Sequence, residues 1–509
     1  MSSSLSNNKR IAKNTLFLYI RMIFIMGVTL FTSRIILDKL GVTDYGIYGA
    51  VGGVVGMLGF LDGTLSTGTS RFLTFELATD NKERLRRTFS TAFYTHLVLA
   101  LLVAIILETA GIWFICNKLI IPPNRLSAAF WCLHFSVLTT IVSITQVPYT
   151  SVIIAHENMG VYAYVGIYEA VMKLLVAYLL SIATWDRLIF YAVLIACVQI
   201  SVAFFYRVFS VRCYWESKLK RIFDKRIFCE MLGFSGWSLM ANVGEVLIQQ
   251  GYVVLINMFF LPAIVAAQTI GNQISGAMMQ FINNFRTAIN PQIIKLYAAK
   301  EYTKSRKLTL NSSVYVFDLL LLLGLPAIVL MEPILNLWLV KVPDYAVVFA
   351  QYIVARNILS NFSAAFYVPM MASGELKDNS LASIFLTFTG FGILYLLLKI
   401  GFSVMWVQYM AIIQCILFSL VVKPLILIKK LNYSVSEISA CVLKCAEIAL
   451  LPCAVSAAIA WCVNLTSIPV MGCAAVVMAL SVCVSAWLFM DGEMRQKLTL
   501  MIKNKILKR

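Results

Sequence analysis

Long apolar stretches separated by short polar breaks recur along the chain from Asn14 to Met490. Each stretch is close to the roughly 20 residues that an α-helix needs to cross about 30 Å of hydrocarbon. Helices satisfy their own backbone hydrogen bonds in lipid, so the pattern predicts helices rather than strands. The expected spans are 14–37, 45–71, 88–115, 126–152, 160–184, 187–210, 230–258, 262–290, 308–331, 345–372, 380–400, 404–427, 438–463 and 467–490. We therefore predict an all-α polytopic membrane protein with about fourteen transmembrane helices.

The composition agrees with a surface that is largely covered by lipid. Of the 509 residues, 60% are hydrophobic and 13% are charged, whereas a soluble domain carries about 25% charged residues. No gap between spans is long enough for a folded domain, and we find neither a catalytic constellation nor a Gly-rich phosphate loop with a lysine. We therefore expect neither an enzyme nor a nucleic-acid-binding protein.

The longest gap, 211–229, has the pattern of a basic amphipathic helix. Apolar side chains would share one face of that helix, with lysines and arginines around it; the apolar positions are Trp215, Leu219, Ile222 and Phe223. Such a helix would lie on the membrane surface. A solvated charged linker is the alternative. The basic tail, 491–509, has a similar character.

The net charge of +18 is distributed unevenly between the two sides of the membrane. If the N-terminus is cytoplasmic, 29 basic residues fall on the cytoplasmic side and six on the opposite side. This bias follows the positive-inside rule and predicts that both termini are cytoplasmic, which requires an even number of spans. The N-terminus lacks a small-residue cleavage site after a short apolar core, so we interpret the first span as retained.

The sequence contains an internal repeat. When the chain is compared with itself at one constant shift, the spans of the first copy fall on those of the second copy without a gap. This shift carries the basic loop at Arg84, Arg86 and Arg87 onto Lys304, Arg306 and Lys307. Six spans separate the copies, so both copies have the same orientation, as in transporters built from parallel repeats. We predict two six-helix lobes that rock about a central cavity; a static duplicated bundle is the alternative.

The repeat also gives the predicted domain organisation, in which two C-terminal helices lie outside the repeat. The expected segments are an N-terminal lobe at 1–210, the linker at 211–229, a C-terminal lobe at 230–427, two extra spans at 438–490 and a cytoplasmic tail at 491–509.

Charges at membrane depth are costly and usually face a cavity or a partner. Arg21 in the first span and Arg356 in the tenth have no acid within one helical turn, so they are candidate ligands for an anionic substrate. Pairing with an acid on another helix is the alternative. Arg71 and Arg286 lie near the cytoplasmic ends of their spans and would line the cavity mouth or snorkel to headgroups.

Acidic residues in the spans are candidates for ion coupling or for counter-charge. These are Glu245 and Asp62. By contrast, Glu169 and Lys173 are one turn apart and are interpreted as a structural pair. His96 and His134 are interpreted as satisfied core histidines.

The second span is rich in glycines at spacings of four positions, such as Gly49 and Gly53. Small residues at this spacing let helices approach closely.

The junction of the first two spans carries a family resemblance. It reads Ser33-Arg34-Ile35-Ile36-Leu37-Asp38-Lys39-Leu40-Gly41-Val42-Thr43-Asp44-Tyr45-Gly46-Ile47-Tyr48. This resembles Wzx-type lipid-linked oligosaccharide flippases, in the polysaccharide transporter branch of the MATE-like superfamily. There, an arginine followed by a Leu-Gly turn and a Tyr-Gly-Ile-Tyr-like stretch is common.

The resemblance implies a bacterial cytoplasmic (inner) membrane protein that moves a polyprenyl-diphosphate-linked glycan to the outer leaflet. Its roles would be in O-antigen, lipopolysaccharide or capsule assembly. The implied partners are this glycan lipid, membrane lipids and other polysaccharide assembly proteins. No cofactor is expected, while coupling to a proton or sodium gradient stays open because of Glu245.

Two other functions are compatible with parts of the pattern. A MATE-type multidrug or cation antiporter would commonly carry a buried acid in the first span, whereas 14–37 contains Arg21 and no acid. A membrane-bound polymerase or glycosyltransferase would need a catalytic loop and would not explain the repeat.

Overall fold

The computed structural model describes residues 2–58, 66, 69–70, 72–74, 76–77, 82–156, 158–231, 246–465, 467–490 and 495. Within these ranges it describes all side chains except those of residues 2–21, 159, 248, 284, 287–288 and 291. Every regular element in this part of the chain is a helix.

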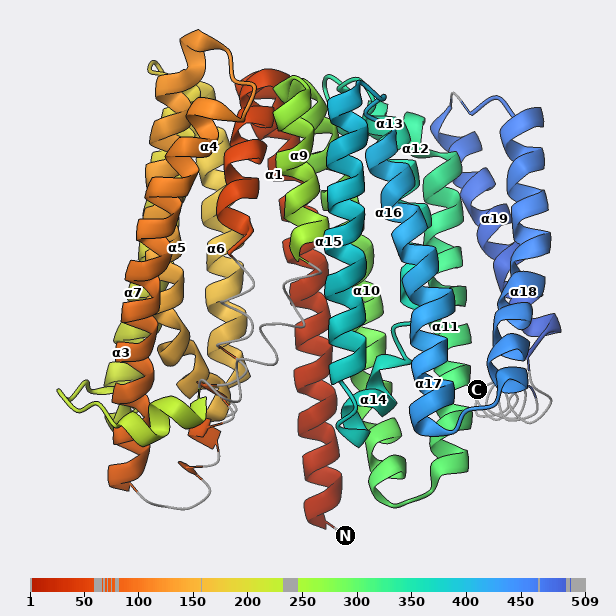
Figure 1. Ribbon diagram of the computed structural model, residues 1–509, viewed down its shortest axis with the longest axis horizontal. Coiled ribbons are helices and arrows are strands. Elements are labelled where there is room, and N and C mark those ends of the chain that lie inside the picture. Colours follow the sequence, from red (N-terminus) through yellow and green to blue (C-terminus); the bar gives the residue numbers. More distant parts are fainter. Residues whose placement is uncertain are drawn as a thin grey trace. The chain divides into compact units, whose positions relative to one another are not determined.

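The helices follow one another along the chain, as Figure 1 shows. In the N-terminal half they are α1 (Ser2–Gly56), α3 (Lys82–Ile106), α4 (Ile112–Asn117), α5 (Leu126–Ala155), α6 (Met159–Leu179), α7 (Arg187–Cys213) and α9 (Tyr252–Phe259). Then come α10 (Pro262–Ala298), α11 (Tyr302–Val329), α12 (Met331–Trp338), α13 (Ala346–Phe362), α14 (Tyr367–Ser373), α15 (Lys377–Ile400), α16 (Trp406–Ile416), α17 (Lys423–Leu431), α18 (Val435–Cys462) and α19 (Ile468–Leu488). Short π-helical segments join α3 to α4, precede α9, and join α16 to α17.

These helices confirm the predicted all-α polytopic fold. Within the described residues, nine helical stretches are long and apolar enough to cross a membrane. Where they are described, the other five predicted spans also lie on helices: 14–37 and the start of 45–71 on the two parts of α1, the end of 230–258 on α9, 262–290 on α10, and 345–372 on α13–α14. The break between the first two spans is the kink of α1 at Gly41, whose φ of +78° favours glycine.

The predicted repeat appears in the positions where helices begin. α3 begins at 82 and α11 at 302, while α5 begins at 126 and α13 at 346, so both pairs have the same offset as the basic loops. α6 and α15 begin at 159 and 377, and α7 and α16 begin at 187 and 406, so these pairs keep the offset to within two positions. The two copies of the repeat therefore align with almost no insertion, as the spacing of apolar stretches in the sequence predicts.

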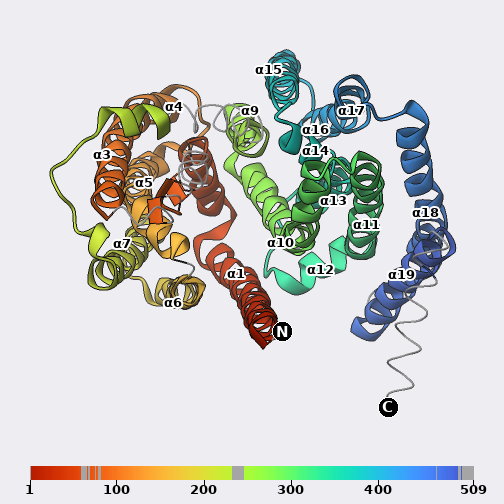
Figure 2. The same ribbon diagram turned by 90° about the horizontal axis from the view of Figure 1, so that it is seen from below.

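Packing divides the chain into two compact units. The first unit comprises 1–269, 338–344 and 387–407, and the second comprises 270–337, 345–386 and 408–509. In the first unit, α5 packs on α3 and α7; in the second, α11 packs on α13. The two C-terminal helices α18 and α19 pack on each other and on α11, as Figure 2 shows. The domain boundaries predicted from the repeat stay predictions.

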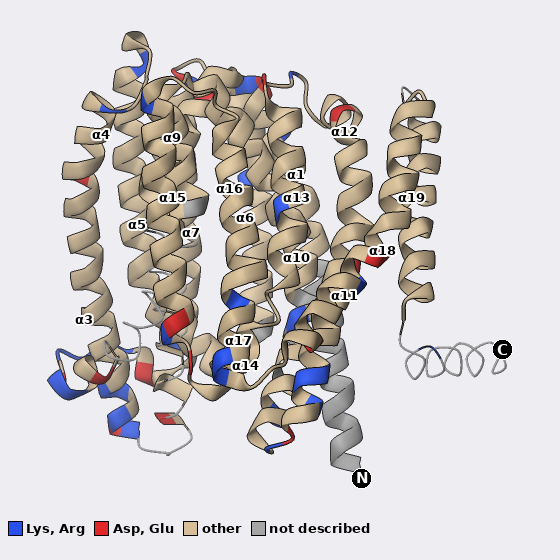
Figure 3. Ribbon diagram, turned by 45° about the vertical axis from the view of Figure 1, so that its right-hand side comes forward, with Lys and Arg blue, Asp and Glu red and all other residues tan. Residues whose placement is uncertain are grey.

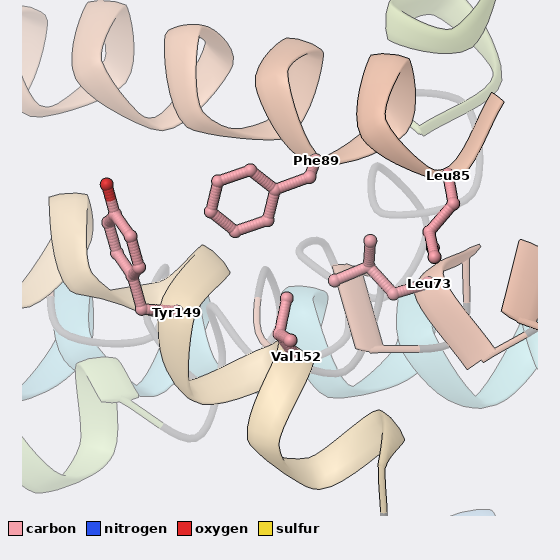
Figure 4. Packing of buried hydrophobic residues seen from close by; sticks show 5 residues of the cluster. All are labelled: Leu73, Leu85, Phe89, Tyr149 and Val152. Atoms are coloured by element: carbon pink, nitrogen blue, oxygen red, sulfur yellow. The ribbon is translucent and has the colours of Figure 1, made fainter. Parts of the chain in front are cut away.

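A buried cluster fixes α3 on α5 in the first unit (Figure 4). The Phe89 and Tyr149 rings meet edge to face, with centroids 5.3 Å apart, and Leu73, Leu85 and Val152 complete the cluster. An aromatic pair of this geometry adds about 0.5–1.5 kcal/mol to the burial of its area. The cluster lies one to two turns from the start of α3 and therefore positions the basic residues there.

The glycines of the second span provide the predicted close approach. An added Cβ at Gly46 would overlap the carbonyl of Pro262 at the start of α10. At Gly53 it would lie 3.0 Å from Val253 of α9. The second part of α1 therefore packs against α9 and the start of α10 with almost no space for a side chain.

The linker at 211–229 differs from the continuous amphipathic helix that its pattern predicts. After α7 ends at Cys213, only a 3₁₀ turn at Trp215–Ser217 forms before a helix begins again at Lys225. The backbone amides of Lys220 and Asp224 donate instead to side chains of α3, at 3.3 and 3.0 Å. These hydrogen bonds hold the linker in an irregular path along α3.

Candidate functional site

The candidate site residues fall into described and undescribed parts of the chain. Arg71, Asp62 and Glu245 lie outside the described residues, as does the side chain of Arg21. Arg286 on α10 and Arg356 on α13 are described, and both are half-buried in the second unit.

Arg356 lies where α13 meets α16. Its carbonyl oxygen accepts a hydrogen bond from the Cys415 thiol at 3.7 Å. Both the Arg356 guanidinium and the Lys423 ammonium lie within electrostatic range of that thiol. The charges of Arg356 on α13 and Lys423 on α17 therefore both act on the Cys415 thiol.

Lys423 is one of the 29 basic residues that the charge bias assigns to the cytoplasmic side. In the structure it is half-buried, and its Nζ donates to the Ser363 carbonyl and hydroxyl at 3.3 and 3.2 Å. Its neighbours in sequence, two valines before it and Pro424-Leu425 after it, are apolar. That apolar setting was the signal available for assigning Lys423 to the interior.

A polar seam joins α10 to α13 in the second unit. Asn357 Nδ2 donates to Ser275 Oγ at 2.8 Å, and Asn361 Nδ2 contacts Met279 Sδ at 3.2 Å. The paired positions advance together, so the two helices run in the same direction. Asn357 and Asn361 are buried, and burying their amides is favourable only because they have hydrogen-bond partners.

The seam fixes the relative depths of the two described arginines. Arg356 directly precedes Asn357, which pairs with Ser275 of α10. Arg286 lies eleven positions beyond Ser275 on α10. At 1.5 Å per residue this is about 16 Å. Arg356 and Arg286 therefore lie at different depths and do not form one bidentate clamp.

A half-buried carboxylate, Asp318, lies on α11 of the same unit. Asp318 Oδ1 is shielded from solvent and has no hydrogen-bond partner among the described residues, and the carboxylate is attracted by Lys444 of α18. Local spacing on α18 would pair Lys444 with Glu447 and gives no sign of a contact with α11. Contacts between helices far apart in sequence are not encoded in local spacing.

Of the residues interpreted as structural, the Glu169–Lys173 pair behaves as expected and the two histidines differ from expectation. Lys173 Nζ lies 2.6 Å from Glu169 Oε1, and Gln199 donates to the same oxygen at 3.1 Å. His96 is buried in the core and its Nδ1 contacts the Ala92 carbonyl of its own helix at 2.7 Å, but its Nε2 is buried without a hydrogen-bond partner among the described residues. His134 is exposed instead of lying in the core, and its Nδ1 lies 2.9 Å from Glu108 Oε2.

The stretch that carries the family resemblance has a structural role. The Arg125 guanidinium binds Asp44 with two hydrogen bonds, at 2.8 and 2.5 Å. It also binds Asp186, the N-cap residue of α7, at 2.5 Å. One arginine thereby joins the starts of α5, α7 and the second part of α1.

The fold is similar to that of solved transporters. An inward-facing multidrug resistance MATE family transporter of the MOP superfamily gives a TM-score of 0.67 at 12% identity, covering 84% of this chain and 99% of that chain. The MATE multidrug transporter DinF-BH, solved in complex with a ligand, gives 0.61 at 16% identity over 82% and 96% of the two chains. A MOP superfamily transporter from Pyrococcus furiosus, for which a reverse polarity of the binding pocket suggests a different function, gives 0.59 at 12% over 83% and 97%.

No protein-family model matches the sequence, and no curated protein matches it. At these identities the likeness concerns the arrangement of helices. The chain therefore has the fold of MATE-like transporters of the MOP superfamily.

Proposed function

We propose that the protein is a transporter that flips polyprenyl-diphosphate-linked oligosaccharide units from the cytoplasmic to the outer leaflet by alternating access. It would act in surface polysaccharide assembly in the bacterial inner membrane, with both termini in the cytoplasm. The fold, which is that of solved transporters, supports the transport part of this proposal.

The observation that carries the substrate class is the sign of the charge within the spans. The first span contains Arg21 and no acid between Asn14 and Leu37. In the second unit, Arg356 and Lys423 are both half-buried, and the charges of both act on the Cys415 thiol. Cationic groups at membrane depth stabilise an anion, and arginine matches a phosphate with two hydrogen bonds. The pocket of reverse polarity in the Pyrococcus furiosus transporter provides a precedent for such a change within the fold.

The second candidate is a multidrug or cation antiporter of the MATE type. Asp318 favours it, because a half-buried carboxylate with one shielded, unsatisfied oxygen is a group that a cation or a proton would neutralise. Glu245 and Asp62 would be further coupling residues.

A deletion strain separates the two candidates. The flippase predicts loss of surface glycan and accumulation of the lipid-linked unit on the cytoplasmic side, with drug sensitivity unchanged. The antiporter predicts normal surface glycan, together with drug resistance on overexpression. Normal glycan in the deletion strain would contradict the flippase.

A further inference from the structure

A basic pocket lies in the first unit, between the first turns of α3 and the linker that follows α7. Its volume is about 390 Å³. The side chains that define its chemistry are Lys82, Arg86, Arg87, Lys220, Glu83 and Trp215. The lining of the pocket thus contains four cationic groups and one carboxylate. Figure 3 shows lysines and arginines gathered at this end of α3.

Hydrogen bonds between the linker and α3 hold the pocket open and in place. Arg86 Nε donates to the Lys218 carbonyl at 3.2 Å, and its guanidinium lies 5.9 Å from the centre of the Trp215 ring. The Lys220 amide donates to Ser90 Oγ at 3.3 Å, which places the Lys220 side chain beside α3. The two walls of the pocket are therefore fixed by contacts that do not use the lysine ammonium groups.

A contact with His156 holds the other side of the linker. Glu216 is buried, and its Oε1 lies 2.5 Å from His156 Nε2 at the end of α5. The His156 ring also stacks on Tyr214, with centroids 4.2 Å apart. The buried Glu216 carboxylate thus has a hydrogen-bond partner, and the linker is anchored on both sides.

The charges of the pocket select an anion. Glu83 lies 3.3 Å from Arg87 and balances that residue. Lys82, Arg86 and Lys220 provide the remaining positive charge. Several nitrogen donors around a cavity of this size match the oxygens of a phosphate group.

The position of the pocket indicates that this phosphate belongs to a lipid. The helical stretch that starts at Lys82 is long and apolar enough to cross a membrane, so the pocket lies at its polar end. Beside the pocket, the linker exposes Trp215 by 41%, Leu219 by 41% and Phe223 by 52%. Exposed aromatic and aliphatic side chains next to lysines are typical of segments that rest in the headgroup layer.

We propose that this pocket binds the phosphate of an anionic phospholipid headgroup. The site is separate from the candidate substrate residues on α10 and α13, and it does not depend on the proposed function. Lys82 and Lys220 act as the charge partners of the headgroup, while Arg86 and Trp215 form the wall.

Two charge-matched double variants of the full-length protein test the site. Lys82→Gln with Lys220→Gln removes two charges from the pocket, whereas Lys225→Gln with Arg226→Gln removes two from the same linker outside the pocket lining. Each protein is purified in detergent, checked for unchanged melting temperature, and titrated with short-chain phosphatidylglycerol, phosphatidylcholine or inorganic phosphate. Bound lipid is counted by native mass spectrometry.

The wild-type protein is expected to bind one phosphatidylglycerol in preference to phosphatidylcholine. A lysine near a lipid surface contributes about fivefold in affinity, so the pocket variant should bind roughly 25-fold more weakly, and the control variant should bind like wild type. Equal weakening in both variants, or weakening in neither, overturns the site. Displacement of the lipid by inorganic phosphate at equal concentration overturns the lipid assignment in favour of a soluble ligand.

Discussion

Arg86 and Arg306, which occupy equivalent positions in the repeat, make the same two contacts in the two halves of the chain. Arg86 donates to the Lys218 carbonyl and lies 5.9 Å from the Trp215 ring. Arg306 donates to the Asn432 carbonyl at 2.8 Å and lies 5.8 Å from the Tyr433 ring. In each half an arginine near the start of one helix thus holds the segment that follows α7 or its counterpart, the stretch of α16 and α17. The repeat extends to single side-chain contacts.

This relationship predicts equal and independent losses of stability. Arg86→Ala and Arg306→Ala should each lower the free energy of unfolding by about 1–2 kcal/mol, because each removes a charge-assisted hydrogen bond and a cation–π contact. The two residues lie in different units and share no partner, so the double variant should show the sum. Thermal unfolding in detergent measures these losses.

Arg226→Ala is the control, because that side chain is 89% exposed and should change stability by less than about 0.5 kcal/mol. A loss in only one half would contradict the functional equivalence of the two arginines.

The contact between Gly46 and Pro262 predicts a sharp difference between two glycines of the same helix. Gly46→Ala should lower stability by roughly 1–3 kcal/mol, because the new methyl group overlaps the Pro262 carbonyl and pushes α1 away from α10. Gly52→Ala should be neutral or slightly stabilising, since nothing lies within 4 Å of its added Cβ. The melting temperatures of both variants in one detergent provide the comparison. Similar values would show that this close approach is not tight.

Within the Arg125 network, the Asp186 carboxyl predicts a loss of stability in acid. Burial alone would raise the pKa of Asp186, but hydrogen bonds from Arg125 and from the Ile189 and Leu188 amides bring it below the ordinary 3.8. A lowered carboxyl pKa stabilises the fold above the unfolded value, and this stabilisation disappears as the pH falls through the folded value. Wild type should therefore lose stability from about pH 4 downward.

Asp186→Asn is the matched variant for this prediction. It should be less stable than wild type at pH 7, and the difference should shrink as the pH falls below about 4. Melting temperatures between pH 3 and pH 7 give the curve. A difference that stays constant over this range would exclude Asp186 as the titrating group.

Periodicity predicts most of this fold because lipid imposes one rule on every span. The kink at Gly41, the starts of α11 and α13, and the close approach at Gly53 all follow from apolar length and small-residue spacing. The linker after α7 does not follow, because its path depends on Ser90 and Thr91, which lie far earlier in the sequence, on α3. Amphipathic spacing alone favoured a helix there.

The candidate site is harder to predict from the sequence, because it too depends on contacts between residues that are far apart in the chain. Arg356 could be selected because it has no acid on its own helix, but the action of Arg356 and Lys423 on the same Cys415 thiol arises from the packing of the helices that carry them. Likewise, Glu447 is the acid nearest to Lys444 along its own helix, whereas packing lets Lys444 attract Asp318 of α11. Charge pairs between helices require the tertiary structure.

The central claim is that arginines within the spans bind the diphosphate of a glycan lipid. Its most direct test is surface glycan display in a deletion strain that expresses Arg21→Ala, Arg356→Ala or the exposed control Arg226→Ala at equal membrane levels. We expect display to fall in both arginine variants and to remain normal in the control, while Arg356→Lys, which keeps the charge but not the bidentate geometry, retains part of it. Normal display in both Arg21→Ala and Arg356→Ala would contradict the claim.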